Sequence, residues 1–126
     1  MERLVDLDEA AAEVSARTPE WQAAGLVVGR VAWREAAAPW PHRLETDRSR
    51  VADPDAMGVR LYGPADALLS VVLFRGGWAD GDHITGAGDA GPLPGAGIGS
   101  AAAFGSRLDA WVALVFGDPR APRPAS

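Results

Sequence analysis

Residues 67–75, with the sequence ALLSVVLFR, constrain the fold of this chain more than any other segment. The segment has the length of a strand and is rich in side chains that favour strands. Its two alternating sets of side chains are both apolar, which is typical of a central strand covered on each side. The first set is Leu69, Val71 and Leu73, and the second is Leu68, Val72 and Phe74. The segment therefore predicts a sheet with packing partners on both faces.

An N-terminal helix is predicted by a run of helix-forming residues that contains neither Gly nor Pro. Asp6 can cap the start of this helix, with Glu9 at the spacing of a capping box. Thr18 followed by Pro19 indicates a second helix start. We therefore expect two short helices, or one kinked helix, ending near Ala24.

A C-terminal helix is predicted from Ser100, as its N-cap, to Phe116, with Gly117 closing it. Its apolar residues recur at helical spacing and form a stripe that should pack on the sheet. The stripe consists of Phe104, Leu108, Trp111, Val112 and Val115.

Strand patterns fill much of the chain between these helices. Residues 26–35 (LVVGRVAWRE) and 58–62 (GVRLY) each favour a strand, and 78–85 (WADGDHIT) favours a returning edge strand. Residues 42–48 are predicted to form a short polar strand or an ordered loop. The Gly- and Pro-rich segment 86–99 predicts no regular structure.

The order of these elements predicts an α+β fold. We expect an N-terminal helix, an antiparallel sheet of four to five strands, and a C-terminal amphipathic helix packed on that sheet. One domain should cover residues 1–117. Residues 118–126 (DPRAPRPAS) should form a disordered, Pro-rich tail.

Composition excludes several classes of function. The chain of 126 residues contains no Cys, which rules out disulfides and thiolate zinc sites. Its net charge of −5 argues against nucleic-acid binding. The sequence contains no apolar run long enough to span a membrane and no uninterrupted apolar leader, so we expect a cytoplasmic protein without membrane partners. All twelve basic residues are Arg, which indicates a GC-rich, actinobacterial coding sequence.

Asp80, Asp82 and His83 form the most reactive-looking cluster in the sequence. Two carboxylates and an imidazole could ligate a divalent ion, and this leaves a small metal- or ligand-dependent enzyme as an alternative function. In a strand, however, His83 would point away from both carboxylates. We therefore predict no catalytic residue, no metal ligand and no cofactor.

Tryptophan is abundant, and two of the five indoles lie at predicted turns. Trp40 stands between prolines, and Trp78 follows two glycines. Tryptophans in such loops often fold back to cap a small core, and this core-lid role is the alternative to an interface role. Exposed Trp residues often anchor protein interfaces, and acidic neighbours would attract a basic partner. The predicted partner-binding residues are Trp40, Glu45, Asp47, Trp78, Asp80 and Asp82.

Several segments of the chain form a recognisable order of elements. They are Trp21, residues 25–28 (GLVV), 44–48 (LETDR) and 69–78 (LSVVLFRGGW), and the helix residues Phe104, Leu108 and Trp111. Together these segments resemble small bacterial immunity proteins of polymorphic toxin systems, especially the TriTu type. The resemblance spans about Trp21 to Gly117, mostly as the order of elements, and the segment 86–99 departs from it. No functional residue is carried over from the family.

The resemblance and the acidic charge together favour a non-enzymatic protein-binding domain. The expected role is that of an immunity protein that inhibits a basic toxin domain by steric and electrostatic blocking. A structural or chaperone subunit that binds through an apolar sheet face is a further alternative.

Overall fold

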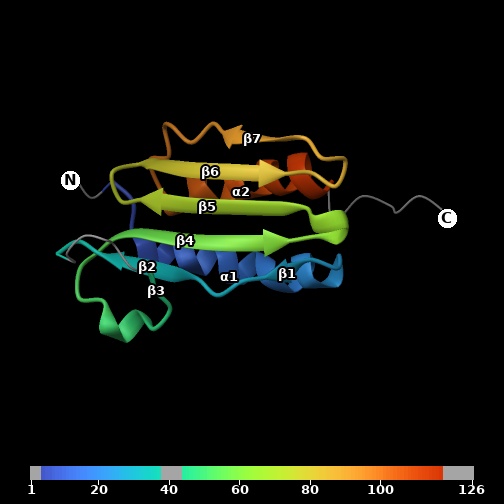
Figure 1. Ribbon diagram of the computed structural model, residues 1–126. Coiled ribbons are helices and arrows are strands. Elements are labelled where there is room, and N and C mark those ends of the chain that lie inside the picture. The colour runs from blue at the N-terminus through green and yellow to red at the C-terminus, as the bar shows by residue number, and fades with distance from the viewer. Residues whose placement is uncertain (1–3, 38–43, 118–126) are drawn as a thin grey trace.

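The computed structural model describes residues 4–37 and 44–117. Seven strands form one antiparallel sheet, and two helices pack on it (Figure 1). The strands are β1 (Val27–Val28), β2 (Ala32–Glu35), β3 (Leu44–Glu45), β4 (Pro54–Tyr62), β5 (Leu68–Phe74), β6 (Trp78–Ile84) and β7 (Ala90–Leu93). The helices are α1 (Leu7–Ala23) and α2 (Ala101–Phe116), with short 3-10 turns η1 (Arg48–Arg50) and η2 (Pro64–Asp66). This arrangement confirms the predicted α+β class.

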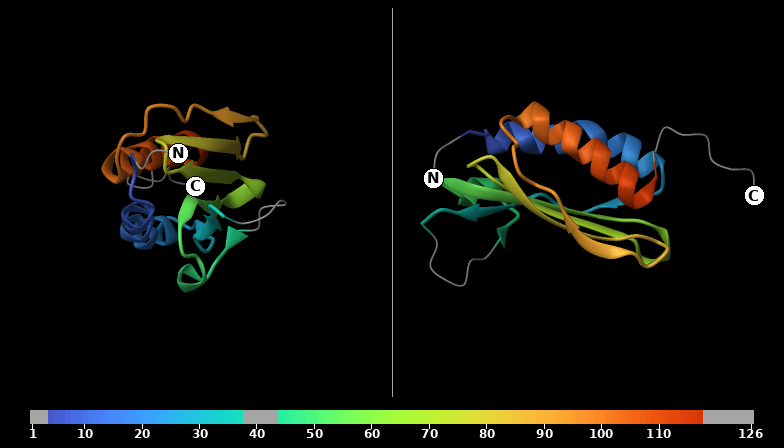
Figure 2. Two further views of the ribbon diagram at one scale, coloured as in Figure 1. Left: turned by 90° about the vertical axis from the view of Figure 1, so that its left-hand side faces the viewer. Right: turned by 90° about the horizontal axis from the view of Figure 1, so that it is seen from above.

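Both helices lie on the same face of the sheet, which we call the inner face (Figure 2). The opposite face, called the outer face, is covered by no described helix. The strand order is β3-β2-β4-β5-β6-β7, and β1 pairs with β4 beyond the end of β2. Neither described helix is long and apolar enough to cross a membrane.

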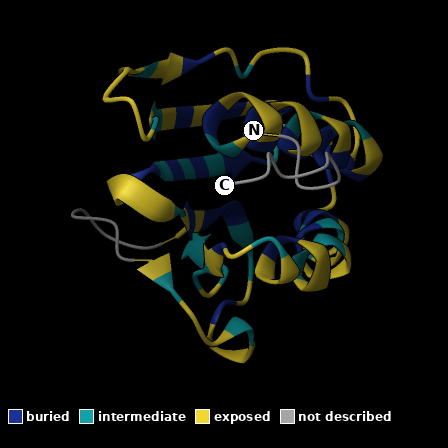
Figure 3. Cartoon of the chain, turned by 90° about the vertical axis from the view of Figure 1, so that its right-hand side faces the viewer, coloured by how far each residue is buried: buried dark blue, intermediate teal, exposed yellow. Residues whose placement is uncertain are grey.

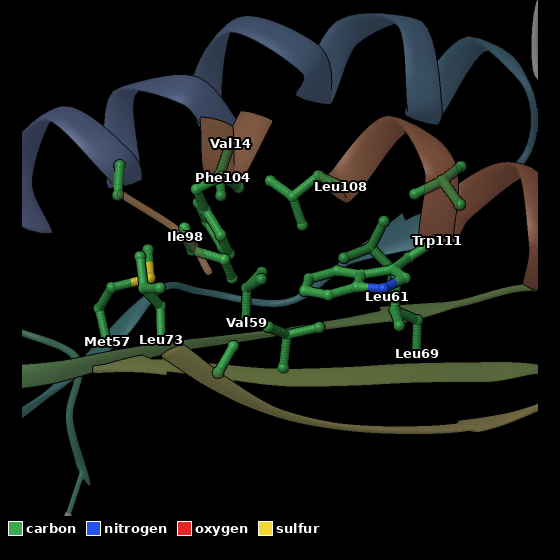
Figure 4. Close-up of a cluster of buried hydrophobic side chains, with 14 of the residues drawn as sticks. Val14, Met57, Val59, Leu61, Leu69, Leu73, Ile98, Phe104, Leu108 and Trp111 are labelled. Carbon is green, nitrogen blue, oxygen red and sulfur yellow. The ribbon is translucent and has the colours of Figure 1, made fainter. Parts of the chain in front are cut away.

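The hydrophobic core lies between the helices and the inner face (Figures 3 and 4). Phe104, Leu108 and Trp111 of α2 point toward the strands, where Trp111 lies near Leu61 and Leu69 (Figure 4). All five residues of the predicted C-terminal stripe are buried. Because apolar burial drives folding, this layer fixes the helices on the inner face.

The ends of α2 follow the sequence prediction. The Ser100 Oγ accepts a hydrogen bond from the Ala103 backbone N–H at 3.0 Å. Gly117 ends the helix with φ +86°, a conformation that favours glycine. Local capping and the apolar stripe were therefore sufficient to place this helix.

The N-terminal segment forms one helix, with Pro19 inside it. Asp6 is the predicted N-cap, and its Oδ1 accepts hydrogen bonds from Asp8 N and Glu9 N. The predicted second start at Thr18 does not occur, because the Thr18 hydroxyl donates back to the Val14 carbonyl at 2.8 Å.

The sheet has more strands than the four to five that the sequence predicted. The expected strand 26–35 is split into β1 and β2, because three residues (29–31) lie between the paired positions Val28 and Ala32, opposite only two residues of β4 (59–60). Gly29 approaches the neighbouring strand closely, and its N–H donates to the Arg60 carbonyl at 2.8 Å. Within the predicted polar segment 42–48, the described part contains β3 and the start of η1.

The segment 86–99 also differs from its prediction, since it contains β7. Strand β6 is consequently not an edge strand, because β7 pairs along its free side. After β7, the Gly95 carbonyl accepts from Ala79 N at 2.8 Å, and Arg107 donates to the carbonyls of Pro94 and Ala96. Backbone pairing with β6 and the hydrogen bonds of Arg107 thus order part of segment 86–99, although its own residues have no preference for regular structure.

Strand β5 is central, as predicted, but it is covered by helices on one side only. Its inner side chains Leu69, Val71 and Leu73 are fully buried. On the outer side, Phe74 is buried whereas Leu68 and Val72 remain half-buried. The predicted tail 118–126 lies outside the described residues, and the domain boundary at residue 117 stays a prediction.

Candidate binding surface

The outer face of β4, β5 and β6 is a regular grid, because the three strands pair without a shift from Ala56 to Tyr62. Directly paired residues point to the same side of a sheet, so each set of partners forms a row across it. The four rows are Ala56–Phe74–Trp78, Gly58–Val72–Asp80, Arg60–Ser70–Asp82 and Tyr62–Leu68–Ile84. The end rows are mostly apolar, and the charges lie in the two middle rows.

Most large exposed hydrophobic side chains of the described chain lie on this outer face. They comprise Val27, Leu44, Tyr62, Trp78 and Ile84, with exposed fractions from 42% to 64%. The register places Val27 beside Tyr62, and places Leu44 in line with Arg34 and Ala56. Only Leu4 and Leu114 are comparably exposed elsewhere in the described ranges. Apolar side chains gathered on one open face are typical of an interaction surface.

Trp78 is held in place although 42% of its surface is exposed. Its ring stacks on Phe74 with 3.9 Å between centroids and 14° between planes. The Arg34 guanidinium lies 5.2 Å from the Phe74 centroid, and Asp55 accepts two hydrogen bonds from Arg34 at 2.7 and 2.8 Å. A rigid aromatic side chain loses little entropy on binding, so Trp78 is pre-organised as an anchor.

The outer face carries charges of both signs on opposite sides of β5. Asp80 and Asp82 are exposed on β6, and neither has a hydrogen-bond or ion-pair partner among residues 4–37 and 44–117. Arg60 on β4 and Arg30 beside it are also exposed without a partner in the described chain. These four side chains are available to pair with charges on another molecule.

A groove of about 280 Å³ lies on the β4 side of this face. Gly58 forms part of its floor, and a Cβ added there would contact Val71 and Val72 at 3.3–3.4 Å. Leu44 and Tyr62 line its apolar part, and its lining also includes Arg30 and Arg60. The groove therefore combines an apolar floor with two cations.

The structure separates the predicted partner-binding residues into two groups. Trp78, Asp80 and Asp82 lie together on β6, whereas Glu45 and Asp47 lie at the β3 end of the sheet. The two acids near β3 are engaged locally: Glu45 accepts from Asp47 N at 2.9 Å, and Asp47 accepts from Ser49 N and Oγ. These bonds from Ser49 lower the pKa of Asp47. The predicted residue Trp40 lies outside the described residues.

Strand alternation keeps His83 apart from the two carboxylates of β6, as the sequence predicted. His83 pairs with Leu69, an inner-face residue, while Asp82 pairs with Ser70 on the outer face. Within the described part of the chain, no group of three His, Asp or Glu side chains could hold a metal ion. The alternative enzyme based on this cluster gains no support from the geometry.

A second cleft, of about 330 Å³, lies between the start of α1 and the start of β4. Its charges are already paired: Arg48 binds Asp8 at 2.7 Å, and Arg75 binds Asp53 at 2.9 Å. The charged side chains of these two pairs are therefore already engaged within the chain.

Several residues of the outer face were not identified from the sequence, among them Arg34, Gly58, Arg60 and Phe74. Arg60 and Tyr62 alternate with buried residues, which is typical of a strand with one solvent-facing side. The grouping of these residues with β6 depends on strand register, which needs the paired strands.

No protein-family model matches the chain, and no curated protein or solved structure matches it either. These comparisons do not bear on the resemblance to TriTu-type immunity proteins, which stays a prediction.

Proposed function

We propose that this chain is a non-enzymatic protein-binding domain that holds its partner on the outer face of the sheet. The observation that carries the proposal is the cluster of exposed apolar side chains around the anchored Trp78. Burial of such a cluster supplies binding free energy, and the unpaired charges beside it supply specificity. Inhibition of a toxin by steric and electrostatic blocking is one specific role that such a face would support.

Photo-crosslinking from single positions in the native cells tests this proposal. A benzophenone amino acid at Ile84 samples the outer face, and the same residue at Leu114 samples the solvent side of α2. Both side chains are exposed, at 42% and 60%, so neither replacement disturbs the core. We expect a discrete protein adduct from position 84 and none from position 114.

A second substitution checks that the adduct reports a specific contact. Trp78→Arg removes the anchor in the opposite end row of the grid, three rows away from the probe, and should abolish the adduct from position 84. Equal adducts from positions 84 and 114, or none from position 84, would show that the outer face is not the binding surface.

A further inference from the structure

We propose that the partner of the outer face is a second copy of this chain, docked face to face about a two-fold axis that runs along β5. This inference rests on the proposed function, because it names the occupant of the same surface. It follows from the positions of the charges and of the groove in the grid.

The two charged residues of the third row lie at equivalent positions on either side of β5. Ser70 lies at the centre of that row, with Arg60 on one side and Asp82 on the other. Neighbouring strands are about 4.8 Å apart, so the two charges are about equally distant from the centre of β5. They have opposite signs, and neither is paired within the described residues.

The two-fold axis is parallel to β5 and lies between the two outer faces. Rotation by half a turn about it exchanges β4 with β6 and leaves the position along the strand unchanged. Arg60 of each copy then faces Asp82 of the other copy, and two ion pairs form. Packed sheets keep their strand directions within about 30° of each other. Such an angle between the two sheets shifts residues close to the axis by only a short distance. This distance is small compared with the length of an arginine side chain, so the ion pairs can still form.

The same rotation places an acid over the groove of the second copy. Asp80 faces Gly58, which forms part of the groove floor. The carboxylate of Asp80 would therefore enter a groove whose lining includes Arg30 and Arg60. Shape and charge agree on one arrangement, which is what a self-complementary interface requires.

Other occupants fit the charge pattern less well. A two-fold axis across the strands, between the middle rows, would place Asp82 of one copy over Asp80 of the other and bring like charges together. A uniformly basic protein would be attracted by Asp80 and Asp82 but repelled by Arg30 and Arg60 on the same face. A partner must present both signs in the opposite order, and a second copy does so.

The interface would be small. The paired area measures about 20 Å along the three strands and about 14 Å across them, which places it among weak, transient interfaces. Its centre is the half-buried outer side of β5, where Leu68 and Val72 would lose their remaining contact with water. We therefore expect a reversible dimer whose population depends on concentration.

Sedimentation velocity with charge-reversed variants tests the arrangement. The wild type should shift with concentration from the monomer mass of 13.1 kDa toward twice that value. Arg60→Asp places two acids opposite each other in both pairs, and Asp82→Arg places two arginines opposite each other. Each variant alone should dimerise about a hundredfold more weakly, since apposed like charges cost several kcal/mol.

Mixing gives the decisive measurement. An equimolar mixture of the two variants restores attraction in both pairs and should form a heterodimer that neither variant forms with itself. The chain that carries both substitutions should dimerise by itself, and this also shows that the variants fold. Glu9→Arg on α1, a charge reversal away from the sheet, should leave dimerisation at the wild-type level.

Two outcomes would overturn the inference. One is a wild-type chain that stays monomeric to the limit of its solubility. The other is a mixture no more associated than its separate components. If position 84 nevertheless crosslinks to a different protein, the proposed function stands and only the second copy is excluded as partner. Absence of any adduct from position 84 would remove both proposals.

Discussion

Two tryptophans show how burial and stacking give one residue type two different roles. Trp111 is 4% exposed and meets Phe104 edge-on at 6.4 Å, inside the core. Trp78 is stacked on Phe74 but remains 42% exposed on the outer face. The sequence placed Trp111 in the core by helical spacing, whereas it left Trp78 between a core lid and an interface residue.

Alanine substitutions should separate these two roles. Trp111→Ala should lower the unfolding free energy by about 3–5 kcal/mol, because it leaves a large cavity. Trp78→Ala should cost less than about 1.5 kcal/mol, mainly through the lost stacking contact. Chemical denaturation measures both, with Leu114→Ala on the solvent side of α2 as the control. A Trp78→Ala variant as unstable as Trp111→Ala would assign Trp78 to the fold rather than to binding.

The ion pair of Asp8 with Arg48 should contribute to acid sensitivity. Hydrogen bonds from Arg48, at 2.7 and 3.0 Å, lower the pKa of Asp8 below its ordinary value of 3.8, and partial burial opposes this shift. Because the folded state holds the carboxylate charged, the stabilisation is present above the ordinary pKa and is lost as the pH falls through the lowered pKa.

Asp8→Asn should therefore reduce stability near neutral pH and have little effect in strong acid. Both side chains are substantially exposed, so we expect a loss of only about 0.5 kcal/mol. Urea unfolding of the two proteins over a series of pH values measures the difference. In an Arg48→Gln background the effect of Asp8→Asn should vanish, and its persistence there would contradict the assigned cause.

At the scale of elements, the sequence predicted the helices and strands that depend on their own residues alone. Capping residues and spacing placed α2, and alternating apolar residues placed β5. Strand β7 was missed because Ala90–Leu93 has no strand propensity of its own, and pairing with β6 orders it. The split between β1 and β2 was missed for a similar reason, since the close approach of Gly29 to Arg60 involves a distant segment.

Gly95 should be the most sensitive position of the crossing from β7 to α2. A Cβ added there would lie 2.0 Å from the Ala79 carbonyl oxygen, so the backbone must move and the Ala79–Gly95 hydrogen bond weakens. Gly95→Ala should cost about 2–3 kcal/mol. Gly99→Ala has nothing within 4 Å and should change stability by less than about 0.5 kcal/mol. Similar melting temperatures for both variants would mean that this crossing does not pack on β6.

At the scale of the whole molecule, the candidate surface combines residues that are far apart in the sequence. Residues 34, 60 and 82 share the outer face only because β2, β4, β5 and β6 pair in one register. Trp78, Asp80 and Asp82 could be named from the sequence, because they alternate within one strand. The opposite charge of Arg60 on β4 could not be associated with them without the sheet.

Thermal unfolding should depend on protein concentration if the outer faces pair. A ligand that binds only the folded state raises the melting temperature by mass action, and here the ligand is the chain itself. The melting temperature of the wild type should rise with concentration, whereas that of Arg60→Asp should stay constant. Parallel behaviour of the two proteins in a dilution series would argue against association through this face.

The lengths of the two edge strands have a consequence for how this protein behaves when concentrated. At one edge β3 has two residues, and at the other β7 has four residues, including Pro92. Long open edges recruit further strands and lead to fibrils, whereas short edges that contain proline resist such growth. Association through the outer face, by contrast, ends with a dimer, because each copy has only one such face. A crowded solution of this chain should therefore contain discrete particles rather than polymers.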